Sequence, residues 1–126
     1  MPDLRDRPAA QAAVTRQSTE VAAARAYLHD CTGQIWERAL AGDAVRGDAL
    51  AMTFGAASHA IEVAHKTVES MCATAGTSAL YVESPLERAH RDMHAMLRHI
   101  IAQPVWQEQA GRVLFGMEPT DLLFTV

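Results

Sequence analysis

The sequence contains few cysteines. Only two of its 126 residues are cysteines, and Cys31 and Cys72 are too far apart to form a known metal or redox spacing. A disulfide framework or a structural zinc site is therefore excluded as the basis of the fold. We predict that both residues are buried free thiols in a reducing cytoplasm.

Long apolar runs and basic clusters are also missing. No apolar run approaches the ~18 residues that a membrane-spanning helix needs. The first residues, MPDLRDRPAAQ, are charged and contain no apolar core of a signal peptide. Formal net charge is −4, without a run of lysine and arginine. We therefore predict a cytoplasmic protein with neither a membrane nor a nucleic acid as partner.

Strand signals are absent, whereas helix signals are abundant. Apolar residues make up 49% of the chain but aromatic residues only 6%, and much of the remainder is alanine, the best helix former. There is no alternating apolar pattern and no Asn-Gly hairpin dipeptide. A chain of this length fits one domain, so we predict a single all-α domain over residues 1–126.

Four helices are predicted, two long and two shorter, in an antiparallel four-helix bundle. Their expected ranges are 8–41, 49–74, 85–104 and 104–115. In the first, Val14, Val21 and Leu28 recur at helical spacing as an apolar stripe.

Capping residues mark the helix ends. Asp48 is the candidate N-cap of the second helix. In Ser84-Pro85-Leu86-Glu87, the serine can cap, the proline takes the first helical position and the glutamate closes a capping box. The expected stops are Gly42, Gly76, Pro104 and Gly116.

Two Glu-x-x-His motifs raise the possibility of a metal site. Glu62 and His65 share one helix face, as do Glu87 and His90, and such pairs on two helices can build a di-iron carboxylate site. The additional glutamates would come from Glu20 or Glu37, and from Glu108. Alternatively, His90 and His94 alone could hold one ion. Because no glutamate lies at a recognisable position, we expect no metal and interpret His65 and His90 as hydrogen-bonded core residues.

The remaining histidines differ in their helical surroundings. His29 and His59 are predicted to lie at the surface. If the third helix continues to Pro104, His99 shares a polar face with Ala95, Asp92 and Arg88. On this interpretation, His99 can reach a cavity beside the bundle.

A series of landmarks resembles the C-terminal helical domain of the acyl-CoA dehydrogenase superfamily. The series comprises Gly76-Thr77-Ser78, Ser84-Pro85-Leu86-Glu87-Arg88, Arg91-Asp92, His99, Gly111-Arg112 and Gly116-Met117-Glu118-Pro119. It is most similar to the two-component flavin-dependent monooxygenases. These enzymes hydroxylate aromatic or heteroaromatic substrates with reduced flavin from a partner reductase.

The resemblance implies roles for particular residues. His99 corresponds to a histidine near the C4a–N5 edge of the flavin, where it would hydrogen-bond the oxygen-carrying flavin or act as acid or base on the substrate. Gly76, Thr77 and Ser78 correspond to a cofactor-binding turn that approaches flavin (FMN or FAD), often from a neighbouring subunit. Arg91 and Asp92 would form an ion pair that orients the third helix. The Gly116–Pro119 segment would close over the cofactor.

The resemblance covers only one of three domains. The N-terminal helical domain and the middle β domain of such enzymes have no counterpart in this sequence. We therefore expect weak or no flavin binding by this chain alone. A separate chain that carries the other two domains is a candidate partner. The alternative is a repurposed bundle without flavin chemistry: a small-molecule binder, an interaction module or a non-redox enzyme.

The resemblance also implies a homo-oligomer, a dimer or a tetramer, because this bundle forms the oligomer core in such enzymes. The apolar candidates for the contact surface are Trp106, Leu114, Phe115, Leu122 and Phe124. For Leu114 and Phe115, packing inside the monomer is an equally good interpretation.

Overall fold

The computed structural model describes residues 3–120 and has four α-helices. They are α1 (Pro8–Leu40), α2 (Gly47–Ala75), α3 (Pro85–Met96) and α4 (Val105–Leu114), joined by the short 3-10 helices η1 (Leu4–Asp6), η2 (Gly76–Leu80) and η3 (Ile100–Ala102). No strand occurs within residues 3–120. The predicted all-α class is confirmed.

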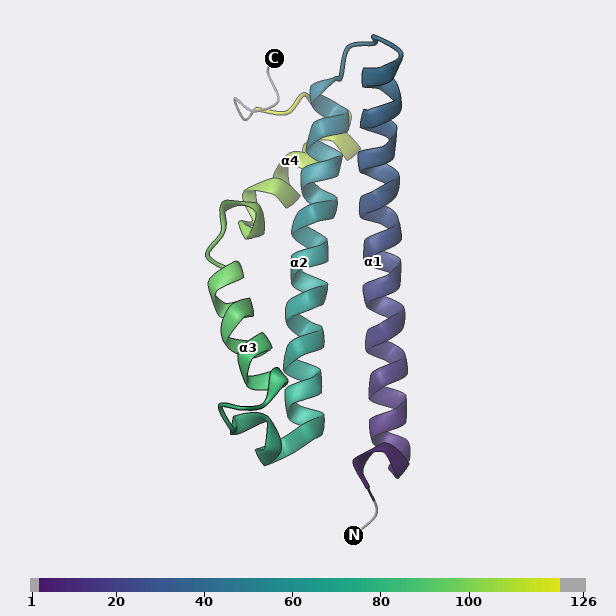
Figure 1. Cartoon of the computed structure of the whole chain (residues 1–126). Helices are drawn as coiled ribbons and strands as arrows, with labels where there is room; N and C mark the ends of the chain where they lie inside the picture. Colours follow the sequence, from purple (N-terminus) through teal and green to yellow (C-terminus); the bar gives the residue numbers. More distant parts are fainter. Residues whose placement is uncertain (1–2, 121–126) are drawn as a thin grey trace.

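Helix α2 is the centre of the bundle. Helices α1 and α2 form a long antiparallel hairpin, and α3 and α4 follow one another back along α2 (Figure 1). Helix α2 packs against each of the other three helices. The two shorter helices thus together occupy the place of one long helix.

Small side chains line the contact between α1 and α2. The buried residues of α1 recur every seven positions and are Ala10, Gln17, Ala24 and Cys31. Val14 and Val21, the predicted apolar stripe, are 49% and 39% exposed. The Oε1 of buried Gln17 lies 3.1 Å from the hydroxyl of Thr67 on α2, and this hydroxyl is also 2.8 Å from the Val63 carbonyl.

The apolar core lies where α4 crosses α2. Trp106 is only 2% exposed and packs with Ala51 and with Phe54, whose ring centroid is 4.8 Å away. The indole N–H of Trp106 donates to the carbonyl of Ile100. The prediction that Trp106 belongs to an oligomer contact was therefore wrong, because this side chain fills the core of the monomer.

The other proposed contact residues have different positions. Leu114 and Phe115 are 75% and 85% exposed, so they do not close the core of this chain. Leu122 and Phe124 lie outside the described residues.

Helix α3 is shorter than predicted. It ends at Met96, and His99 and Gln103 both have extended backbone with ψ of 145°. A residue that precedes proline is disfavoured in the helical region, which accounts for the extended backbone of Gln103 before Pro104. The side-chain amide of Gln103 also donates to the carbonyl of His99 at 3.3 Å, which supports the break.

The predicted caps are only partly correct. Ser84 caps α3, with its Oγ accepting from the amide of Leu86 at 3.3 Å. Glu87 closes no capping box, because the Ser84 amide donates to the Tyr81 carbonyl at 2.8 Å. Asp48 is not the N-cap of α2; that position is Arg46, and the Asp48 carboxylate accepts from its neighbour's amide.

The glycine stops are confirmed. Gly42, Gly76 and Gly116 follow the ends of α1, α2 and α4 with φ of 75°, 65° and 72°, values that favour glycine. None of the helices within residues 3–120 is long and apolar enough to cross a membrane.

Candidate functional site

His99 lies on an exposed turn beyond the end of α3. The prediction that His99 shares a helical face with Ala95, Asp92 and Arg88 was wrong, because the helix ends at Met96. Instead, His99 caps η3: its Nδ1 accepts from the amide of Ile101 at 3.2 Å. Because an amide only donates, the neutral ring carries its proton on Nε2, which can therefore donate to a ligand.

The predicted cofactor-binding turn forms the start of η2. Gly76, Thr77 and Ser78 are all exposed, and the Ser78 hydroxyl donates to the Ala75 carbonyl at 2.8 Å. Gly76 has φ of 65°, and a Cβ placed there would meet no atom within 4 Å. The turn therefore offers backbone that a ligand can approach closely.

The structure does not bring this turn and His99 together. Helix α3 separates them, and its 12 residues correspond to a length of about 18 Å. Figure 1 shows the turn near the start of α3 and the connection to α4 beyond its other end. Within one chain, the two cannot contact the same small group.

The Arg91-Asp92 pair does not orient α3 against another helix. Arg91 pairs with Glu87 and Asp92 pairs with Arg88, each at 3.7 Å and each one turn away on α3. The prediction of an ion pair between Arg91 and Asp92 was wrong, because successive residues point in different directions around a helix.

The segment after Gly116 is held against α4. The buried side chain of Gln109 accepts from the amide of Thr120 at 2.7 Å and lies 3.2 Å from its hydroxyl. Arg112 donates to the carbonyl of Glu118 at 2.8 Å, and Pro119 is buried. Gln109 was not among the predicted site residues. Its one signal in the sequence is an amide close to Trp106 and Ala110, the other buried residues of α4.

An open cavity of about 680 Å³ lies beside the predicted turn. It is lined by α1, η1, the end of α2 and the start of α3, and most of the side chains are small or apolar, including Leu4, Val14, Met71 and Leu86. Ala75, directly before the turn, is also part of the lining. No local pattern predicts this cavity, because its walls come from distant parts of the chain.

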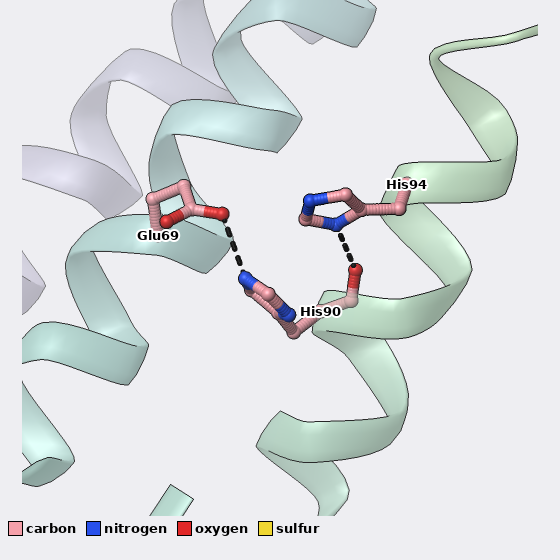
Figure 2. Close-up of side chains that lie close together, drawn as sticks. All are labelled: Glu69, His90 and His94. Carbon is pink, nitrogen blue, oxygen red and sulfur yellow. Dashed lines mark hydrogen bonds and ion pairs between the residues drawn. The ribbon is translucent and has the colours of Figure 1, made fainter. Parts of the chain in front are cut away.

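A polar cluster joins α2 and α3. Glu69 Oε1 lies 2.9 Å from Nε2 of His90 and 3.6 Å from Nε2 of His65. The ring centroids of His90 and His94 are 4.5 Å apart. Figure 2 shows both rings beside Glu69. Within residues 3–120, the group that could hold a metal ion is Glu69, His90 and His94, which differs from the predicted di-metal set.

The predicted environments of the histidines and cysteines are partly confirmed. His29 and His59 are exposed, as predicted, whereas His65 and His90 are only half-buried.

Cys31 is buried, Cys72 is half-buried, and both are free thiols. Burial, and then the negative charge of Glu69, raises the pKa of the Cys72 thiol. Cys72 is therefore a poor candidate for a nucleophile.

Similarity to known proteins places the chain in a family. Residues 1–104 match the family described as acyl-CoA dehydrogenase, C-terminal domain. The chain is 33% identical over 118 residues to the indole-3-acetate monooxygenase of Pseudomonas putida. The matched region covers 94% of this chain and 30% of that relative. It is 25% identical over 117 residues to the indole-3-acetate monooxygenase of Acinetobacter baumannii, covering 93% of this chain and 30% of that relative.

The chain thus spans 30% of the length of each of these two curated relatives. The family match covers most of the chain, including α1, α2 and α3. This chain belongs to the acyl-CoA dehydrogenase C-terminal domain family.

Proposed function

We propose that this chain is the C-terminal helical domain of a flavin-dependent monooxygenase that hydroxylates an aromatic acid. The observation that carries the proposal is the similarity to the indole-3-acetate monooxygenase of Pseudomonas putida over 94% of this chain. Indole-3-acetate, named for both relatives, is the first substrate to test. The remaining domains would be supplied by other parts of the protein or by a separate chain.

His99 is the proposed catalytic residue. Bound reduced flavin would supply the electrons that activate oxygen for hydroxylation. The Nε2–H group of His99 would donate a hydrogen bond at the flavin edge. To act as an acid, the ring would first take up a proton on Nδ1, which would release the Ile101 amide. Two observations support this role. His99 is exposed, and the hydrogen bond from the Ile101 amide to Nδ1 holds the ring while Nε2 stays free to contact a ligand.

Gly76, Thr77 and Ser78 are the proposed flavin-binding turn. The exposed backbone and the open space at Gly76 fit a flattened ligand that approaches closely. Because α3 separates this turn from His99, we propose that the turn contacts the flavin of a neighbouring subunit.

A homodimer or homotetramer follows from this arrangement. The exposed side chains of Leu114 and Phe115 support an apolar contact surface at the end of α4. Light scattering at micromolar concentration should give two or four copies, and a monomer would argue against the shared site.

A cytoplasmic location also stays a prediction, supported by the two free thiols.

A chimaera tests the proposed function. This chain replaces the matched region of the Pseudomonas putida relative, and flavin-dependent oxygen consumption and product formation are measured. We expect His99→Ala to lower the rate by about 10²- to 10⁴-fold, as for general acid–base groups. His59→Ala, an exposed histidine on α2, is the matched control and should leave the rate unchanged. A folded, flavin-loaded chimaera in which His99→Ala keeps full activity would refute the role of His99.

The cavity beside η2 favours a second candidate function. An apolar-lined space of about 680 Å³ is large enough for a small molecule. In this alternative, the bundle binds an apolar ligand without flavin chemistry. Calorimetry on this chain distinguishes the two, because the alternative requires ligand binding that Leu86→Arg abolishes, whereas the first proposal expects weak or no flavin binding by this chain alone.

A further inference from the structure

The geometry points to a binding site for one divalent transition-metal ion between α2 and α3. Its ligands are Glu69 from α2 and His90 and His94 from successive turns of α3 (Figure 2). One ligand atom from each residue lies within 4.8 Å of the other two. This set differs from the Glu-x-x-His pairs, and it is independent of the proposed flavin chemistry.

His94 is already held in the form that binds a metal. Its Nδ1 lies 2.9 Å from the carbonyl oxygen of His90. Because a carbonyl only accepts, Nδ1 carries the proton and Nε2 of the neutral ring keeps its lone pair. In Figure 2 this second nitrogen is on the side of the ring that faces Glu69. Metal-binding histidines commonly donate their other N–H group to a backbone carbonyl in this way.

His90 and Glu69 supply the other two ligand atoms. Nε2 of His90 lies 2.9 Å from Oε1 of Glu69, the distance of a charge-assisted hydrogen bond. An incoming cation would take the place of the proton between them and bind both atoms, while Nδ1 of His90 keeps the one proton of the neutral ring. Because protonated imidazole and carboxyl groups must lose a proton before they bind a metal, binding should weaken in acid. Their side chains are 43% and 47% exposed, which gives the ion access from solvent.

The required movement is small. Neighbouring ligand atoms in a tetrahedral zinc site lie about 3.3 Å apart, as follows from Zn–N distances of about 2.0 to 2.1 Å. The present separations, up to 4.8 Å, can close by rotation of partly exposed side chains. Water would complete the fourth position. His65, with Nε2 at 3.6 Å from Glu69 Oε1, would hydrogen-bond the carboxylate from outside the coordination sphere.

The ligand types select the class of metal. Two imidazoles and one carboxylate suit zinc, nickel, cobalt or copper, whereas magnesium and calcium prefer all-oxygen sites. Because His90 and His94 are one turn apart on α3 and Glu69 lies on α2, a bound ion would cross-link the two helices.

Calorimetric titration of zinc into the untagged, chelator-treated chain tests the site. We expect one ion per chain, with affinity reduced at least tenfold in His90→Ala, His94→Ala and Glu69→Gln. His59→Ala should bind like the parent protein, because this exposed histidine of α2 lies outside the cluster. Cobalt should give the visible absorption of a tetrahedral ion without a thiolate charge-transfer band. Circular dichroism checks that each variant is folded.

Three outcomes would overturn the site. They are no zinc binding, binding that survives in both His90→Ala and His94→Ala, and binding that disappears in Cys72→Ser. The last would indicate a thiolate ligand instead of the proposed set. Because the titration needs no flavin and measures no monooxygenase activity, its failure would leave the proposed function untouched.

Discussion

The two ends of α2 are held in different ways. Towards its start, α2 packs against α4, which buries three of its ten residues, Trp106, Gln109 and Ala110. Towards its end, α2 packs against α3, and none of the twelve residues of α3 is buried. The contact there includes the hydrogen bond between His90 and Glu69, and the Cys72 sulfur, which lies 3.8 Å from the Leu86 carbonyl.

This difference separates stability from ligand access. Burial of apolar surface is the dominant favourable contribution to folding, whereas partly exposed ion pairs add little. We therefore expect the α2–α4 contact to fix the fold and the α2–α3 contact to remain adaptable. An adaptable, polar contact is suited to a metal ion or a cofactor, because its side chains can rearrange without loss of the core.

The largest effect is expected at the α2–α4 contact. Trp106→Ala should lower the free energy of unfolding by about 3 to 5 kcal/mol, since it removes the centre of the core and leaves a cavity. Trp36→Ala is the matched control, because Trp36 is 64% exposed on α1 and should change stability by less than about 0.5 kcal/mol. Urea denaturation measures both. Equal losses would mean that α4 does not anchor the fold.

A smaller loss is expected from a single added methyl group. A Cβ on Gly55 would lie 2.8 Å from the Cβ of Ala110, so Gly55→Ala should cost about 1 to 3 kcal/mol. Gly33→Ala, on α1 with open space around it, should instead stabilise by about 0.5 to 1 kcal/mol. Adding Ala110→Gly to Gly55→Ala should recover part of the loss in thermal denaturation. No recovery would mean that the two helices do not meet at this point.

The cap of α3 should have a local effect. Ser84→Ala removes the acceptor for the Leu86 amide and should cost about 1 kcal/mol. Hydrogen exchange should speed up in α3 and stay unchanged in α4, if the two contacts are independent. Ser18→Ala, in the middle of α1 and exposed, is the control and should have no such effect. Equal acceleration in both helices would show that they unfold together.

The smallest effect is expected at the polar contact. Without metal, His90→Ala should change the free energy of unfolding by no more than about 1 kcal/mol, because its polar contact with Glu69 is partly exposed. Denaturation in the presence of a chelator measures this value. A loss as large as that of Trp106→Ala would contradict the comparison between the two ends of α2.

Prediction of the fold from sequence succeeded for local features. The cap at Ser84, the stops at Gly42, Gly76 and Gly116, and the helical class all depend on a few neighbouring residues. The start of α2 was misplaced, because Asp48 looks like a cap although the helix begins at Gly47. The end of α3 was also misplaced, since the helix pattern continues in sequence while Trp106 and Gln103 favour a bend.

Prediction of the sites was less complete. The sequence offered His90 and His94 alone as one possible pair, and the Glu-x-x-His motifs that begin at Glu62 and Glu87 as a separate di-metal set. Neither alternative included Glu69. It placed His99 on a helical face that the chain does not form. The exposure of the turn at Gly76 fits its predicted role, although its distance from His99 was not foreseen.

By itself, the sequence determined the all-α class, the main helix ends and the family resemblance, because these depend on residue types and on interactions between near neighbours. Only the tertiary structure decided that Gln17 is buried while Val14 is exposed, that Trp106 fills the core, and that Glu69 meets His90. The physical reason is that contacts between helices depend on how each helix is rotated and shifted against the next. That choice minimises the free energy of the whole packed bundle, and no local pattern of residues encodes it.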